Sequence, residues 1–184
     1  MRKPLDVVIT IDRRAKQTSY VDFMVNITQY VLAQLNNTKS PGVQIKLYPE
    51  IHHNLEDVEA EGWNVTNEPP AVTLASISNI LKKNAAESKR SGKKRSRKIV
   101  VYMTDGRPFG GQEPHRKTPA KIGRDVELYV VGVGEETNGK DLEAITRLSP
   151  SKSKTHFFQQ LNPHSNISNL NDISEELLSA ICRA

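Results

Sequence analysis

The sequence predicts an α/β fold in which helices cover both faces of an open, mainly parallel sheet. Segments with the spacing of strands and segments with the spacing of helices alternate almost throughout the chain. Two apolar, β-branched runs, residues 5–12 and 98–105, have the composition of strands buried on both sides. Both runs end in an aspartate, Asp12 and Asp105. Because parallel strands bring their carboxyl ends to one edge, we expect the two aspartates to lie at a common crevice.

The first half of the chain alternates strand, helix, strand and helix. After the strand at 5–12, apolar side chains recur at helical spacing and predict a helix. This apolar stripe consists of Phe23, Met24, Ile27, Val31, Leu32 and Leu35. Residues 43–48 alternate as a half-exposed strand, and residues 49–70 are expected to form a loop with at most a short edge strand. A helix with one apolar side is predicted over residues 73–87.

The second half repeats this order. A strand over residues 99–103 leads into an irregular region rich in glycine and proline. A short helix is expected over residues 119–124, followed by a strand over residues 125–134 that ends in a glycine turn. The remaining predicted elements are a helix at 141–148, a strand at 156–160 and a terminal amphipathic helix at 173–181.

Length and composition limit the possible classes of protein. The chain has 184 residues, enough for one domain with its own apolar core, and we expect a single domain over residues 1–184. Its abrupt start indicates a domain excised from a larger protein. A net charge of +5 and a pI near 9.3 permit acidic partners. No apolar run has the length of a membrane span, so no membrane insertion is expected.

Four Asn-X-Ser/Thr sequons bear on the compartment. They begin at Asn26, Asn36, Asn64 and Asn166. About two would be expected by chance from this composition, so the excess is mild. It favours a secreted glycoprotein.

A dense run of bases lies between the second predicted helix and the strand that carries Asp105. It contains seven cations and no acid: Lys89, Arg90, Lys93, Lys94, Arg95, Arg97 and Lys98. A loop softened by serine and glycine can adapt such charges to the sulfate or phosphate groups of a polyanion. Heparan sulfate is the favoured ligand for a secreted protein. A nuclear localisation signal, nucleic-acid binding and a merely solvated loop are the alternatives.

Five landmarks in a fixed order carry a resemblance to a known family. They are Pro4 to Asp12, Met103 to Arg107, Val130 to Gly134, Asp141 to Ile145, and Ile181-Cys182. Together they resemble the von Willebrand factor type A (VWA) domain over essentially the whole chain, although the stretch between Val43 and Thr73 is shorter than usual for the family. The resemblance implies a Rossmann-like fold with a parallel sheet between two layers of helices.

The resemblance also implies a divalent-cation site, usually for magnesium, at the carboxyl edge of the sheet. Its five positions fall on Asp12, Arg14, Lys16, Thr73 and Asp105. Two bases replace the hydroxyl ligands, and like charges a few ångströms apart repel by about 4 kcal/mol at an effective dielectric near 20. We therefore expect no metal and no other cofactor; magnesium would bind only if water completed its shell. Arg14 or Lys16 is expected to take the place of the cation.

The family implies a non-enzymatic binding module of an extracellular matrix or cell-adhesion protein. Neither a nucleophile elbow nor a glycine-rich phosphate loop is present, so no enzyme activity is expected. Collagen or other matrix proteins would bind at the crevice, where a ligand carboxylate would meet Arg13, Arg14, Lys16 and Arg107. Neighbouring domains of the parent protein would be further partners.

Two other interpretations stay open at this point. An intracellular scaffold of the same fold would use the basic run to contact nucleic acid or a partner in a complex, and a purely structural domain would contact only its neighbours. Cys182 fits the position of a disulfide that ties the two ends of many extracellular relatives. No second cysteine exists in the chain, so this thiol is either free or paired with another module.

Overall fold

The computed structural model describes residues 4–12, 18–37, 43–48, 70–90, 96–105, 122–134, 137, 139–149, 155–160 and 167–183. The elements, in chain order, are β1 (Leu5–Asp12), α1 (Thr18–Asn37), β2 (Val43–Tyr48), α3 (Pro70–Arg90), β3 (Arg97–Thr104), β4 (Val126–Val133), α4 (Gly139–Thr146), β5 (Thr155–Gln160) and α5 (Ile167–Cys182). Every predicted strand and all but one of the predicted helices correspond to one of these elements. The exception, at 119–124, falls partly outside the described residues.

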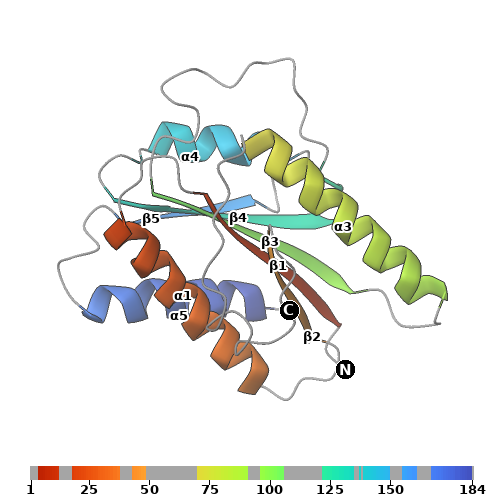
Figure 1. Ribbon diagram of the computed structural model, residues 1–184, viewed down its shortest axis with the longest axis horizontal. Helices are drawn as coiled ribbons and strands as arrows, with labels where there is room; N and C mark the ends of the chain where they lie inside the picture. The colour runs from red at the N-terminus through yellow and green to blue at the C-terminus, as the bar shows by residue number, and fades with distance from the viewer. Residues whose placement is uncertain are drawn as a thin grey trace.

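Within the described residues, five strands form one parallel sheet in the order β2-β1-β3-β4-β5. The chain starts near the middle, moves out to β2, and crosses back over β1 to build the other half. The three inner strands are buried on both faces, which explains their nearly continuous apolar sequences. The predicted fold class is confirmed: the sheet is open and parallel, with helices on both sides (Figure 1).

Alternate side chains of each inner strand enter two separate cores. On β1, Val7, Ile9 and Ile11 pack beneath α1 and α5, whereas Val8 packs beneath α3 and α4. The two helical layers are visible on either side of the sheet in Figure 1. No described helix combines the length and the apolar character needed to cross a bilayer.

Some elements are longer than predicted. Helix α3 begins at Pro70 because proline fits the first turn of a helix, and it continues to Arg90 because terminal cations suit the negative end of the helix dipole. Helix α5 begins at Ile167, six residues before the predicted start. The part of the predicted helix 119–124 that the structure describes, from Ile122 onward, is not helical.

Two glycines near the end of β4 allow close packing. A Cβ atom on Gly132 would lie 2.8 Å from the Leu142 side chain of α4. Gly134 has a positive φ of 95°, and a Cβ atom there would collide with the ring of Tyr20 on α1. The glycine turn predicted at this strand end therefore fixes the start of α1 against the sheet.

Candidate functional site

Two buried carboxylates lie at the carboxyl edge of neighbouring strands. Asp12 is the last residue of β1, opposite Thr104 of β3, and Asp105 follows directly. Both aspartates are fully buried, with relative exposures of 0%. Strand order and register thus bring together the two residues that the sequence places at a common crevice.

Thr73 lies at the same edge of the sheet. Helix α3 leads through a short connection into β3, so it runs back across the sheet and has its first turn near the strand ends that carry the aspartates. Thr73 is in that first turn and is fully buried. Its Oγ1 accepts or donates no hydrogen bond within the described part of the chain, so it is a polar atom still available to a ligand.

Tyr102 adds a phenol to this cluster. Its hydroxyl donates to Oδ2 of Asp12 at 2.6 Å, and the whole side chain is buried. Both residues point to the α3 and α4 side of the sheet, because they stand two register positions apart on adjacent strands. A hydrogen bond to an ionised acceptor is short and strong, so this contact holds the Asp12 carboxylate in one orientation.

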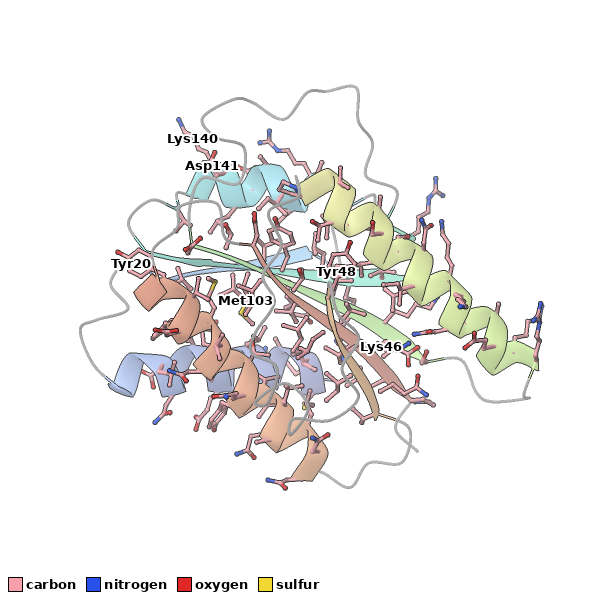
Figure 2. All side chains as sticks on the ribbon, viewed as in Figure 1. Tyr20, Lys46, Tyr48, Met103, Lys140 and Asp141 are labelled. Carbon is pink, nitrogen blue, oxygen red and sulfur yellow. The ribbon has the colours of Figure 1, made fainter. Side chains whose placement is uncertain are left out.

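The neighbouring turn positions α1 beside the crevice. The ring of Tyr20 packs directly over Gly134, and the Thr137 hydroxyl donates to the Gly134 carbonyl oxygen at 2.8 Å. Figure 2 shows Tyr20 at the beginning of α1, beside the end of the sheet. Because residues 13–17 connect Asp12 to this helix, both ends of that connection are anchored in the core.

The profile of the von Willebrand factor type A domain matches residues 26–175. The chain belongs to this family. VWA domains are protein–protein interaction modules, and this chain is one of them. A comparison with curated protein sequences returned no match.

Solved structures with the same fold come from unrelated settings. Proximal thread matrix protein 1 of the mussel byssus superposes with a TM-score of 0.60 at 16% identity, over 98% of this chain and 47% of that one. A von Willebrand factor type A protein from Catenulispora acidiphila gives 0.60 at 13% identity, with coverage of 97% and 43%. The SpRpn10 VWA domain gives 0.59 at 11% identity, with coverage of 92% and 95%.

These identities support a shared fold and nothing finer. The VWA domain described here spans about half the length of the mussel and Catenulispora chains and nearly all of the SpRpn10 domain. In one crystal of the mussel protein, zinc occupies the metal-ion-dependent adhesion site (MIDAS) motif. Whether a cation could bind this VWA domain depends on the side chains at the corresponding positions.

The donor set of this VWA domain does not fit a hard divalent cation. Asp12, Thr73 and Asp105 carry oxygen atoms, but the family resemblance assigns Arg14 and Lys16, which carry none in their side chains, to the positions of the hydroxyl ligands. One oxygen of Asp12 is also engaged by Tyr102. Residues 13–17 lie outside the described residues, as does Arg107, so the positions of their charges are not part of the structure. Among the residues that the structure describes, no three His, Cys, Asp or Glu side chains cluster closely enough to hold a metal ion.

At the amino edge of the sheet, two bases form ion pairs with nearby carboxylates. Lys98 is 7% exposed, and its ammonium group lies 2.7 Å from Oδ2 of Asp125. Arg97 binds the carboxylate of Glu127 through two nitrogens, with Nε 2.6 Å from Oε1. This ion pair raises the pKa of Arg97 above its ordinary value, against the opposing effect of burial. These two bases were expected in an adaptable loop; they are instead fixed at the start of β3.

Arg97 also joins the two ends of the domain. Its backbone nitrogen donates to the Pro4 carbonyl oxygen at 2.8 Å, and its guanidinium donates to the carbonyl oxygen of Ile181 in the last turn of α5. Beside it, the hydroxyl of Tyr129 donates to the Ala180 carbonyl oxygen at 3.2 Å. Burial, followed by the charge of Glu127, raises the pKa of Tyr129.

The other predicted residues divide into exposed and undescribed positions. Lys89 and Arg90 are exposed in the last turn of α3, whereas Lys93, Lys94 and Arg95 lie outside the described residues. Of the four sequons, Asn26 and Asn36 are exposed on α1, and Asn64 and Asn166 are not described. Cys182 is half-buried at the end of α5.

Sequence reasoning missed three contacts that shape the site. Tyr102 belongs to an apolar run and has the sequence signal of a core residue, so its contact with Asp12 follows only from the register of β1 against β3. The partners of Arg97 and Lys98 are separated from them by about thirty residues, and nothing local in the sequence indicates them. These partners are brought together by the register of β3 against β4.

Proposed function

We propose that this VWA domain is an extracellular adhesion module that binds matrix proteins at the carboxyl edge of its sheet without a resident divalent cation. The observation that carries the proposal is the hydrogen bond from Tyr102 to Asp12, in a site whose two hydroxyl positions hold bases. A buried carboxylate oriented by a phenol is suited to a cationic side chain. Arg14 or Lys16 would supply that side chain.

Ligand recognition would then depend on built-in positive charge. A metal-bearing site presents its cation to an acidic residue of the ligand. Here Arg13, Arg14, Lys16 and Arg107, which flank the two buried aspartates in the sequence, would receive that carboxylate. Arginine can do so with two parallel hydrogen bonds, which fixes the direction of approach.

Collagen and other matrix components are the proposed ligands. Support comes from the mussel byssus matrix protein of the same fold and from two sequons that are exposed on α1. We propose no enzymatic activity. The alternative is an intracellular scaffold of the same fold, whose basic run would contact nucleic acid or a partner in a complex. Glycans found at Asn26 or Asn36 of the native protein would favour the extracellular assignment, and unmodified sequons would oppose it.

Calorimetry with magnesium or manganese tests the metal-free site. We expect no binding at submillimolar concentrations and no shift in melting temperature with chelator. The double substitution Arg14→Ser and Lys16→Ser should create measurable affinity, because it restores two hydroxyl donors beside Asp12, Thr73 and Asp105. Submillimolar magnesium binding by the unaltered domain would contradict the proposal.

Binding to immobilised collagen in the presence of chelator tests the ligand face. Replacing Arg13, Arg14 and Lys16 with serine should reduce binding at least tenfold, because the carboxylate loses its charged partners. The matched control changes three exposed cations outside residues 13–17: Arg124, Lys140 and Arg183. Equal losses in both variants would mean that net charge, rather than the crevice, governs binding.

A second binding activity, for a polyanion such as heparan sulfate, is also proposed. Lys89 and Arg90 are exposed, and neither forms an ion pair with any described residue. Three more bases follow within five residues. Retention on a heparin column at 0.15 M salt, with elution that depends steeply on ionic strength, is the expected result.

A further inference from the structure

The outer face of α3 carries two cations that the basic run does not include. Lys82 and Lys83 are exposed, as are Lys89 and Arg90 in the last turn. A separation of seven residues is about two helical turns, so the second pair lies above the first, roughly 10 Å farther along the helix. The four residues therefore form two steps of a ladder, which we call the α3 ladder.

The charges of the α3 ladder are not neutralised locally. None of its four side chains forms an ion pair or hydrogen bond with the described residues. Between its two steps lies the small, exposed Ala86, which leaves room for a chain to lie across the helix. Glu87 is the single acid from Pro70 to Lys98. It stands four residues after Lys83 and three before Arg90, which are spacings of helical neighbours, but it forms an ion pair with neither.

Contacts on the opposite side of α3 fix the direction of the ladder. Leu74, Ile77 and Leu81 are buried against the sheet. Lys46 of β2 donates to Oδ1 of Asn84 at 3.0 Å, which ties the edge strand to the middle of the helix (Figure 2). Because the inner face is held in this way, the four cations point away from the sheet as one surface.

We infer that the α3 ladder is the binding surface for a sulfated polysaccharide. This inference rests on the polyanion-binding activity proposed above. It assigns that activity to four helical residues, of which Lys89 and Arg90 begin the basic run and Lys82 and Lys83 lie outside it. Arg97 and Lys98 cannot serve as expected, because both are paired with carboxylates. Fixed cations spaced along one axis match the repeated negative charges of a linear polymer.

A sulfated polysaccharide is favoured over nucleic acid by what the surface lacks. Residues 70–98 contain no aromatic side chain, so bases could not stack there. Three of the four ladder residues are lysines, which act as point charges and do not read base edges as pairs of arginine donors do. The ladder also lies along the outer side of α3, away from the carboxyl-edge crevice, so both ligands could bind together.

Heparin chromatography of charge-neutralised variants tests the assignment. In the variant Lys82→Gln and Lys83→Gln, helix propensity is nearly unchanged, so circular dichroism should match the unaltered domain. Affinity for heparin should fall at least tenfold, and the slope of log affinity against log salt should fall by roughly one for each cation removed. The matched control, Arg124→Gln and Lys140→Gln, removes the same charge elsewhere and should retain the slope.

Each alternative result has a distinct meaning. If the unaltered domain passes through heparin at 0.15 M salt, the proposed polyanion activity itself is wrong. A second case is that the unaltered domain is retained and the Lys82 and Lys83 variant is retained equally well. If replacing Lys93, Lys94 and Arg95 then abolishes retention, heparin binds those three residues and the α3 ladder is not its binding surface. Duplex DNA and heparan sulfate can be compared as competitors that elute the domain from heparin, at equal concentrations of negatively charged groups. If DNA elutes the domain at the lower concentration, the polysaccharide assignment is overturned.

Discussion

The amino and carboxyl edges of the sheet are stabilised by different kinds of interaction. At the amino edge, bases of β3 pair with acids at the start of β4 and in the turn before it: Arg97 with Glu127, and Lys98 with Asp125. At the carboxyl edge, the buried Asp12 accepts a hydrogen bond from a phenol, and an aromatic ring sits on a glycine. The first arrangement depends on charge, and the second depends on close packing.

This difference shows that a base contributes according to where the backbone holds it. Arg97 and Lys98 lie inside a strand, so their neighbours are set by register and they support folding. Lys82 and Lys83 lie on the outer face of a helix, where neither forms an ion pair with a described residue. Similar side chains thus serve stability in one place and remain available to a partner in another.

The largest effect is expected at the carboxyl edge. Gly134→Ala should lower the free energy of unfolding by about 3 kcal/mol, because the new methyl group meets the ring of Tyr20 and the positive φ disfavours alanine. Denaturant unfolding in 0.1 M and 1 M salt should give the same loss, since no charge is involved. A loss of unfolding free energy that is smaller in 1 M salt would contradict the view that the carboxyl edge depends on packing and not on charge.

Removing the guanidinium at the amino edge should have a somewhat smaller effect. Arg97→Met should cost about 2–3 kcal/mol, because Glu127 and the last turn of α5 lose a charged partner at a partly exposed site. Part of this loss should disappear in 1 M salt. The control Lys89→Met, at an exposed position, should change stability by less than about 0.5 kcal/mol.

Deleting the phenol hydroxyl near the crevice is the next test. Tyr102→Phe should cost about 1–2 kcal/mol, because the buried Asp12 carboxylate loses a hydrogen bond. The same change should weaken collagen binding in chelator, since Asp12 would no longer be held in one orientation. A variant that loses stability yet binds collagen normally would separate the hydroxyl from the proposed ligand site.

The smallest expected effect appears at alkaline pH. The pKa of Tyr129 is raised in the folded state by burial and by Glu127, so its neutral form stabilises the fold. That contribution is complete below the unfolded pKa of about 10 and is lost as pH rises through the folded value. Tyr129→Phe has no such proton to lose. Its deficit in unfolding free energy should therefore narrow above pH 10, and a constant deficit would contradict the assignment.

Most of the fold could be predicted because apolar runs determine which strands are buried. Residues 5–12 have no solvent-facing side, which indicates a central parallel strand. The placement of Asp12 and Asp105 at one edge followed from that prediction. The extra turn of α3 at each end was less accessible, because its termini carry no strong start or stop signal beyond Pro70.

The details of the site depended on contacts between distant residues. A tyrosine within an apolar run is most simply a core residue, and only the register of β1 against β3 brings its hydroxyl to Asp12. A run of seven bases suggests a loop by composition, yet its last two members have acidic partners on β4 and in the turn just before it. Local sequence does not contain this information, because it arises from strand pairing.

Arg97 has a mechanical consequence for the domain. Its backbone meets the first described residue, and its side chain meets the last turn of α5. A force that pulls these two ends apart would act first on the few hydrogen bonds made by Arg97. These bonds would break one after another, whereas separating the strands would require many hydrogen bonds of the sheet to break together. The last helix should therefore peel away at low force, before the parallel strands begin to separate.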